Sequence, residues 1–328
     1  MTTPTDTPRA SVVVATYNRP AMLVRLLRSL AVQDTDDFEV VAVDDGSTPP
    51  TQVDETFPFP FRLIRRANGG AGAARDTGIR EARGEVVIIT DDDMIANPRF
   101  VSAHLTRFDD GCDVVIGRFL LPEDDHVMSF HMGLMDAYFD SCEQSDANIE
   151  PGRLCTGNVS FRRALYDEVG GFDLTLKRCE DKELGLRFAG TGATFGFAHG
   201  GELRHEEGMG QLGDLMTVGY EYGVADVAIG NRHPELPSAS PWFVLAGIQP
   251  LVRLPMRALM RVPWLMRPLA TGVGAVGKAA VKLRINRLAG PLFGLGYALQ
   301  YFAGAVHATG GAAATRRAIA EYEAAAAA

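Results

Sequence analysis

The stretch EVVIITDDD, residues 85–93, joins a β-branched apolar run to three consecutive carboxylates. An apolar run without polar alternation predicts a strand that is buried on both faces. Four further runs of this kind occur at 10–17, 38–43, 61–64 and 113–117. Helical patterns lie between several of them, which predicts an α/β fold with a mixed, mostly parallel sheet flanked by helices.

Two helices are expected between the first four strands. The first begins near Pro20, and the second covers about 71–82 after a turn rich in Gly and Ala. Apolar residues at helical spacing place one buried face on the first helix. Those residues are Met22, Leu23, Leu26, Leu27 and Leu30.

Polar residues follow three of the predicted strands at the point where each one ends. Thr16 and Tyr17 end the first strand, Asp45 follows the second, and an acidic triplet follows the fourth. In open parallel sheets, ligands bind outside the carboxyl ends of the strands. The sequence therefore predicts a binding site at this edge of the sheet.

Within the acidic triplet, Asp91 and Asp93 form a candidate metal site. Alternate side chains of an extended segment share a face, so we expect these two carboxylates to converge and Asp92 to point elsewhere. Hard oxygen ligands of this kind suit Mn²⁺ or Mg²⁺, which keeps positions open for substrate phosphates. The alternative is a solvated acidic turn that caps the next helix.

The loop NGGAGAAR, residues 68–75, follows a strand and opens a helix. Small residues at a helix N-terminus suit an anion such as a phosphate group. The loop is a poor dinucleotide fingerprint because Arg75 occupies the position of the third glycine. It also lacks the Gly-Lys-Ser/Thr ending of a P-loop.

Taken together, the segments SVVVATYNRP, VVAVDDGS, ARDTGI and VVIITDDD resemble, in order and spacing, the inverting family 2 glycosyltransferases of the GT-A (nucleotide-diphospho-sugar transferase) fold. The later segments GGFD and CEDKELGLR resemble the acceptor-side motif of that family. The resemblance covers about residues 10–210. It implies metal-dependent inverting transfer of a sugar from a nucleoside-diphosphate sugar, with UDP as the first candidate, to a hydroxyl of a glycan, lipid or natural-product acceptor.

The resemblance also implies roles for single residues. Asp91 and Asp93 correspond to the DxD pair that holds the diphosphate through Mn²⁺ or Mg²⁺, with Asp92 near the ribose. His205, rather than His199, corresponds to a third metal ligand. The further nucleotide contacts implied are Thr16, Tyr17, Arg19, Asp45, Gly70 and Arg75. A turn residue is the alternative for Asp45, and a surface cation is the alternative for Arg75.

The pair Glu180-Asp181 is the candidate catalytic centre. Inverting transfer needs a group that takes the proton of the acceptor hydroxyl as it attacks. The resemblance assigns this general base to Asp181 and places Glu180 against the acceptor. The alternative is an ordinary helix start, because acids are favourable in a first helical turn.

The net charge of −9 divides into −17 for residues 1–240 and +8 for 241–328. The acidic main body argues against a nucleic-acid-binding protein. Residues 241–320 contain no acid, and basic apolar segments of this kind are typical of elements that bind an anionic membrane surface. The alternatives for the segment 241–315 are a homodimer interface, a helical extension packed on the catalytic domain, or a membrane-spanning helix at 288–310.

We therefore expect a catalytic domain over 1–235 and a basic, apolar helical extension over 236–328. Four Cys without a CxxC pair, and a start without a basic segment before an apolar run, predict a cytoplasmic protein or one peripheral to the inner face of the cell membrane. Two alternative functions stay open. One is a sugar-phosphate nucleotidyltransferase, although the first strand ends in TYNRP rather than in a Gly-rich signature; the other is an inactive nucleotide-sugar-binding scaffold.

Overall fold

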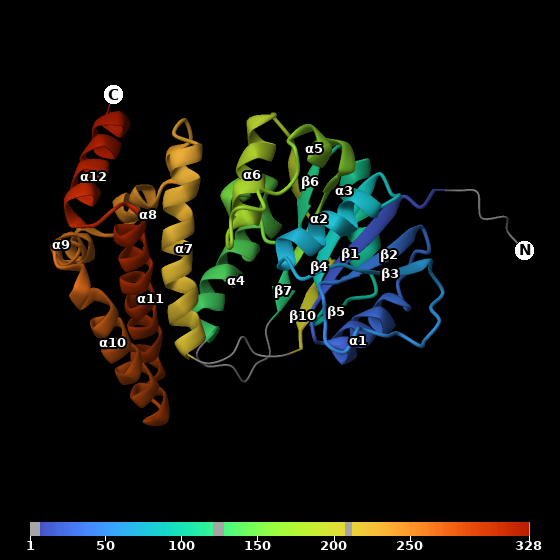
Figure 1. Cartoon of the computed structure of the whole chain (residues 1–328), viewed down its shortest axis with the longest axis horizontal. Helices are drawn as coiled ribbons and strands as arrows, with labels where there is room; N and C mark the ends of the chain where they lie inside the picture. Colours follow the sequence, from blue (N-terminus) through green and yellow to red (C-terminus); the bar gives the residue numbers. More distant parts are fainter. Residues whose placement is uncertain (1–6, 121–127, 207–211, 328) are drawn as a thin grey trace, which may run out of the picture. The chain divides into compact units, whose positions relative to one another are not determined.

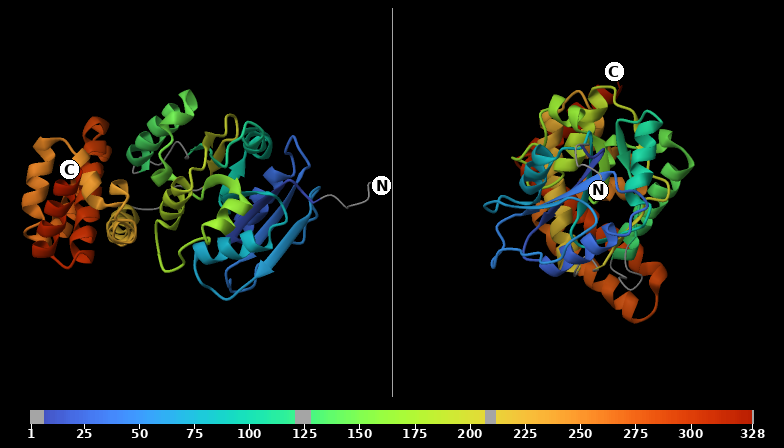
Figure 2. Two further views of the ribbon diagram at one scale, coloured as in Figure 1. Left: turned by 90° about the horizontal axis from the view of Figure 1, so that it is seen from above. Right: turned by 90° about the vertical axis from the view of Figure 1, so that its right-hand side faces the viewer.

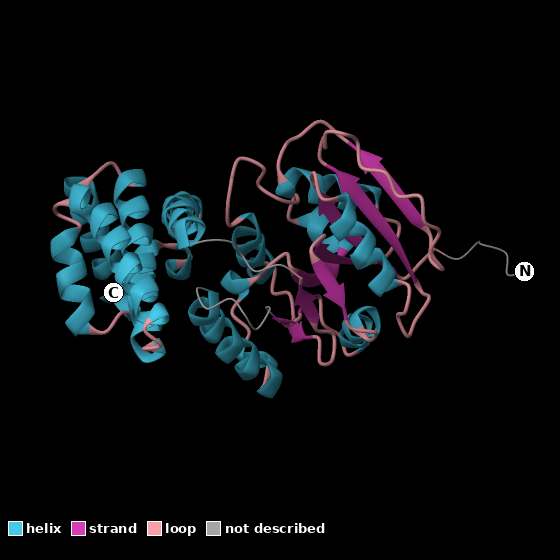
Figure 3. Ribbon diagram, turned by 90° about the horizontal axis from the view of Figure 1, so that it is seen from below, coloured by secondary structure: helices cyan, strands magenta, loops and turns pink. Residues whose placement is uncertain are grey.

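The computed structural model describes residues 7–120, 128–206 and 212–327 (Figure 1). The chain divides into two compact units. The first comprises the residues up to 122 together with 136–207, and the second comprises 123–135 together with 208–328. The described strands all belong to the first unit, and the second unit is built from helices (Figure 3).

The first unit contains a seven-stranded sheet with the order β3-β2-β1-β4-β8-β6-β9. Its strands are β1 (Ala10–Thr16), β2 (Phe38–Asp44), β3 (Phe61–Arg65), β4 (Val86–Asp91), β6 (Val114–Ile116), β8 (Asn158–Arg162) and β9 (Phe195–Phe197). The first four strands are parallel, and β9 is parallel to β6. Strand β8 runs antiparallel to both β4 and β6. The predicted mixed, mostly parallel sheet is confirmed.

The register brings the carboxyl ends of the central strands together. Thr16, the last residue of β1, pairs with Asp44, and Ala15 pairs with Asp91. Every residue of β2 is buried, as expected for a strand covered on both faces. The polar residues that follow the three strands therefore meet at one edge of the sheet.

Helices cover this sheet, as the sequence predicts. They are α1 (Pro20–Leu30), α2 (Ala71–Glu81), α3 (Phe100–Asp109), α5 (Arg163–Glu168) and α6 (Glu180–Gly190). The five apolar residues assigned to one face of α1 are all buried. Helix α4 (Met128–Gln144) runs from the second unit into the first.

A second, three-stranded sheet joins distant parts of the first unit. It contains β5 (Met94–Ala96), β7 (Phe119–Leu120) and β10 (Leu203–His205) in the order β5-β10-β7. In the antiparallel pairing of β10 with β5, His205 lies opposite Met94. This pairing brings His205 beside the acidic triplet, which ends one residue before β5.

The second unit contains α7 (Leu212–Arg232), α8 (Pro241–Gly247), α9 (Pro250–Leu259), α10 (Met266–Lys282), α11 (Asn286–Ala308) and α12 (Ala312–Ala327). Its helices lie side by side in Figure 2. Glycines let α7 and α11 approach closely, because a Cβ at Gly223 would lie 1.8 Å from the Tyr301 carbonyl oxygen. A Cβ at Gly304 would lie 2.0 Å from the Tyr220 carbonyl oxygen. None of the helices in the described ranges is long and apolar enough to cross a membrane, α11 included.

The division into units differs from the predicted boundary at 235/236. Helix α7, which the sequence analysis placed in the catalytic domain, groups with the C-terminal helices because its glycines pack on α11. The Pro/Ser-rich segment 231–241 also lies inside the second unit. Its short 3₁₀ turn (Pro237–Ala239) packs on α7 and buries Ala239 completely.

Candidate functional site

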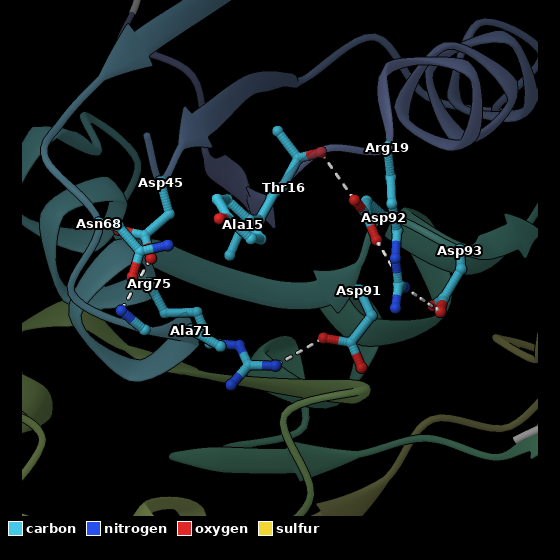
Figure 4. Close-up of a pocket in the computed structure, with 12 residues that line it drawn as sticks. Ala15, Thr16, Arg19, Asp45, Asn68, Ala71, Arg75, Asp91, Asp92 and Asp93 are labelled. Carbon is cyan, nitrogen blue, oxygen red and sulfur yellow. Dashed lines mark hydrogen bonds and ion pairs between the residues drawn. The ribbon is translucent and has the colours of Figure 1, made fainter. Parts of the chain in front are cut away.

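A pocket of about 340 Å³ opens at the edge where β1, β2 and β4 end (Figure 4). The glycine-rich loop before α2 forms its second wall. Nine of the ten residues that the sequence analysis assigned to the nucleotide or the metal line this pocket, together with Ala15, Asn68 and Ala71. Eight of the nine are Thr16, Tyr17, Arg19, Asp45, Gly70, Arg75, Asp91 and Asp92. Asp93 also lines it, whereas His205 lies beside Asp93.

The three acidic residues point to different partners. Asp91 accepts a hydrogen bond of 2.6 Å from Arg75, and Asp92 accepts one of 2.7 Å from the Thr16 hydroxyl. Arg19 lies 2.8 Å from Asp93 and 3.5 Å from Asp92 (Figure 4). The expected convergence of Asp91 with Asp93 is wrong because β4 ends at Asp91 and the next two residues form a turn, where strand alternation no longer applies.

Burial makes the Asp92 carboxyl a weaker acid than an ordinary aspartate. Removal from water raises the pKa of its carboxyl to about 6, although the Thr16 hydroxyl and the Arg19 guanidinium act in the opposite direction. The neighbouring charges of Asp93 and Asp91 raise the pKa further. Three carboxylates this close create a strongly negative corner, which favours the binding of cations.

Asp93 and His205 are the best candidates to hold a metal ion. His205 Nε2 lies 3.6 Å from Asp93 Oδ1, and each side chain is 12% exposed. Neither Asp93 Oδ1 nor His205 Nδ1 has a hydrogen-bond partner in the described part of the chain. A buried carboxylate oxygen without a partner, beside an imidazole, fits a divalent cation. In the described ranges, no three His, Cys, Asp or Glu side chains gather in a metal-binding cluster.

Asp45 organises the glycine-rich loop. Its carboxylate accepts hydrogen bonds from the backbone N–H groups of Gly69, at 3.1 Å, and Gly70, at 2.7 Å. Arg66 lies 3.4 Å away. Gly70 has a φ of 90°, which an L-residue adopts only with strain. The Asp45 carboxylate thus binds the backbone N–H groups of the loop just before α2 begins.

Arg75 is buried between two carboxylates from different parts of the chain. Its Nη2 donates to Asp91, and its Nη1 lies 3.1 Å from Glu180 Oε1 on α6. The side chain is 9% exposed, so the alternative of a surface cation is wrong. Arg75 therefore connects the end of β4 to the helix that carries the candidate base.

Asp181 lies in the first turn of α6. Its Oδ1 accepts from the Lys182 backbone N–H at 2.8 Å, and its Oδ2 accepts from the Thr156 backbone N–H at 3.3 Å. Burial raises the pKa of the Asp181 carboxyl to about 6, and the charge of Glu180 raises it further, while Arg75 opposes the shift. A carboxylate with this pKa is a better proton acceptor near neutral pH than an ordinary Asp.

The contact of Asp181 with Thr156 is absent from the sequence analysis. The two residues are 25 positions apart, and no motif links them. The segment from Cys155 to Gly157 lies beside both Asp91 and Asp181. A Cβ at Gly157 would lie 3.6 Å from Asp91 Oδ2. Burial raises the pKa of the Cys155 thiol, and the nearby charge of Asp181 raises it further. The position of this segment between Asp91 and Asp181 follows from the folded structure and not from a sequence motif.

The role of Arg75 as a structural link can be tested through stability. We expect Arg75→Met to lower the free energy of unfolding by about 3 kcal/mol, since it leaves the largely buried Glu180 and the partly exposed Asp91 without their counter-charge. Arg80→Met on the same helix is the matched control, because Arg80 is 62% exposed and its ion pair is with Asp76 at 2.9 Å. We expect about 0.5 kcal/mol for the control. Urea denaturation of both variants measures the difference, and equal losses would contradict this role.

Comparison with known proteins agrees with the fold. Residues 11–170 match the family model described as glycosyl transferase family 2. This segment of the chain belongs to that family, and the first unit has the GT-A fold. The match ends before α6, so the candidate base lies outside it.

Individual relatives are distant. A glycosyltransferase of Haemophilus influenzae is 25% identical over 191 residues, which cover 54% of this chain and 60% of that protein. Chondroitin synthase of Pasteurella multocida is 27% identical over 242 residues, which cover 61% of this chain and 25% of the synthase. The structure of the mannosyltransferase PcManGT from Pyrobaculum calidifontis, in complex with GDP-Man and Mn²⁺, aligns with a TM-score of 0.57. It is 22% identical, and the alignment covers 93% of this chain and 88% of PcManGT.

Proposed function

We propose that the protein transfers a sugar from a nucleoside-diphosphate sugar to an acceptor hydroxyl, with inversion at the anomeric carbon and with the help of a divalent cation. The observation that carries the proposal is the arrangement at the pocket. An unpartnered carboxylate oxygen of Asp93 beside His205 lies at the same strand edge as a buried arginine that leads to Asp181.

The donor nucleotide would occupy the pocket between β1 and the glycine-rich loop. Tyr17 is half exposed at the pocket, so its ring is free to lie against a base. Arg19 is half exposed and pairs with Asp93 in the acidic corner, and it would turn to a phosphate oxygen of the donor. Asp45 and Gly70 shape the opposite wall. UDP stays the first candidate, and the GDP-Man bound by PcManGT makes GDP the second.

Asp93 and His205 would hold Mn²⁺ or Mg²⁺, and the Mn²⁺ of PcManGT favours such an ion in this fold. When bound, the cation would neutralise the charge that develops on the departing diphosphate. Asp91, which the sequence analysis paired with Asp93 as a metal ligand, is held by Arg75 in the present arrangement. Asp92 accepts a hydrogen bond from the Thr16 hydroxyl, and a contact of Asp92 with the ribose stays part of the proposal.

Asp181 would take the proton of the acceptor hydroxyl as its oxygen attacks the anomeric carbon, opposite to the leaving diphosphate. Two backbone N–H groups fix its carboxylate, so the proton acceptor is already oriented. Glu180 would contact the acceptor, and Arg75 holds its carboxylate in place. The proton thus moves to an Asp181 oxygen, while the diphosphate departs on the donor side.

A donor panel tests this function. The purified chain is incubated with UDP-, GDP- and dTDP-sugars and Mn²⁺, and release of the nucleoside diphosphate is measured with and without a chelator. We expect turnover with one donor class, and NMR of the glycoside would show the inverted anomer. Tight nucleotide binding without turnover would favour an inactive scaffold. Pyrophosphate release from a nucleoside triphosphate and a sugar phosphate would favour a nucleotidyltransferase.

The pH dependence of transfer gives a second test. A base works only in its ionised form, so we expect kcat/KM to increase with pH up to a plateau, with a midpoint near the Asp181 pKa of about 6. Below this pH the carboxyl is protonated and transfer falls about tenfold per pH unit. The profile is measured with the preferred donor at constant Mn²⁺. A rate that is flat from pH 5 to pH 8 would contradict the assignment.

A further inference from the structure

Exposed apolar side chains concentrate in one part of the second unit. Seventeen large apolar side chains are exposed in the described residues, and thirteen of them lie between Phe243 and Leu295. Leu251 is 86% exposed and Trp264 is 73% exposed. Single exposed leucines are ordinary on protein surfaces. A concentration of exposed apolar side chains marks a site that interacts with another protein, a membrane or a ligand.

These side chains form rows along two helices, which Figure 1 labels. On α9, Leu251, Leu254 and Ala258 have the spacing of one helical face and are exposed, while Met256 on the other side is buried. Helix α9 therefore has one apolar side buried within the protein and a second apolar side exposed on the surface.

Helix α10 repeats this pattern. Leu269 and Val276 lie seven residues apart on one exposed face, and Leu283, directly after the helix, continues the same spacing. Gly277, which packs on Phe293 of α11, belongs to the buried face. We call the exposed rows of α9 and α10, together with Trp264 between them, the apolar surface.

The charges around the apolar surface identify its partner. Residues 249–288 carry eight Arg or Lys and no Asp or Glu. Lys278 and Lys282 lie one turn apart on α10, and both are exposed. Leu and Trp flanked by cations match the headgroup region of a bilayer that contains anionic lipids. A second copy of the same surface would bring like charges together, which is unfavourable.

We propose that the apolar surface lies in the interface of an anionic membrane and holds the enzyme there without crossing the bilayer. The α9 and α10 side chains would enter the boundary between headgroups and acyl chains, and the lysines would remain among the headgroup phosphates. Peripheral binding agrees with the lack of a membrane-spanning helix among the described residues. The inference does not depend on the proposed sugar transfer.

Intrinsic fluorescence of the full chain tests the proposal. The protein has two Trp, and Trp242 is 7% exposed, so a change in polarity at the surface is reported mainly by Trp264. The probes are vesicles of phosphatidylcholine alone and vesicles that also contain phosphatidylglycerol. We expect a blue shift of the emission and co-sedimentation only with phosphatidylglycerol, and both weaken at high salt. No binding, or equal binding to both vesicles, would overturn the proposal.

Matched variants separate this surface from general stickiness. We expect the double variant Leu251→Gln with Leu254→Gln to weaken partition into the anionic vesicles by about tenfold or more. The control is Val32→Gln with Leu174→Gln, two exposed apolar residues of the first unit, and it leaves partition unchanged. Circular dichroism confirms that both variants are folded. Equal losses in the two variants would overturn the proposal.

A second copy of the chain is the competing occupant of this surface. Sedimentation velocity without lipid distinguishes it, because self-association depends on protein concentration. If the Trp264 emission shifts with protein concentration and not with lipid, the surface is a dimer interface and the membrane proposal is overturned. Since vesicle binding needs no donor or metal, an inactive but membrane-bound protein would refute only the proposed function.

Discussion

Replacing Asp181 with Asn is expected to reduce kcat for sugar transfer by about three orders of magnitude, while the affinity for nucleoside diphosphate stays within about twofold of the original protein. The amide has the shape of the carboxylate but cannot accept the acceptor proton. The change also removes one of the two acceptors for the backbone N–H groups of Thr156 and Lys182. Because the donor pocket is lined by other residues, donor binding is unaffected.

Transfer and nucleotide affinity are therefore measured separately, the first with saturating donor and the second by calorimetry with Mn²⁺. Glu180→Gln is the matched control on the same helical turn. It weakens the pairing with Arg75, so we expect mainly a higher KM for the acceptor. If Asp181→Asn lowered nucleotide affinity and transfer to the same extent, Asp181 would be a structural residue and the assignment as base would be withdrawn.

The main sheet and its binding edge follow from sequence patterns because buried parallel strands leave a continuous apolar signal. The segments of β1, β2 and β4 are such runs, and the polar residues at their ends can be recognised from the sequence without knowing the register. The three-stranded sheet carries no such signal, since β5 and β10 have three residues each. Its pairing explains why His205, proposed from the family resemblance alone, lies beside Asp93.

Side-chain partners were harder to predict than positions. Strand periodicity predicts that Asp91 and Asp93 lie on one face. Because the chain turns after β4, Asp91 instead accepts a hydrogen bond from Arg75, and Asp93 accepts one from Arg19. Turn geometry depends on local backbone angles, which alternation does not encode. The same limit applies to α7, whose pattern shows a helix but not that its glycines fit against α11.

Asp93 is the proposed metal ligand whose loss is expected to have the largest effect on nucleotide binding. Asp93→Ala is expected to weaken Mn²⁺-dependent binding of the nucleoside diphosphate by at least about 100-fold, since loss of partners outside the ligand shell alone costs 10 to 100-fold at metal sites. The change removes a buried carboxylate oxygen that faces His205 and has no hydrogen-bond partner among the described residues. Binding that remains in the presence of a chelator depends on other pocket residues and stays unchanged.

Loss of Asp93 also releases Arg19, which is 2.8 Å away, so an effect on Arg19 must be separated from an effect on the metal. Arg19→Met is the control, because it breaks the same ion pair and leaves the carboxylate in place. We expect Arg19→Met to weaken nucleotide binding equally with Mn²⁺ and with chelator, whereas Asp93→Ala removes only the difference between them. Calorimetry under both conditions, with Mn²⁺ paramagnetic resonance to count bound ions, measures this difference. An Asp93→Ala protein that still binds the ion with the nucleotide would place the metal elsewhere, and Asp91 would then be the carboxylate to test.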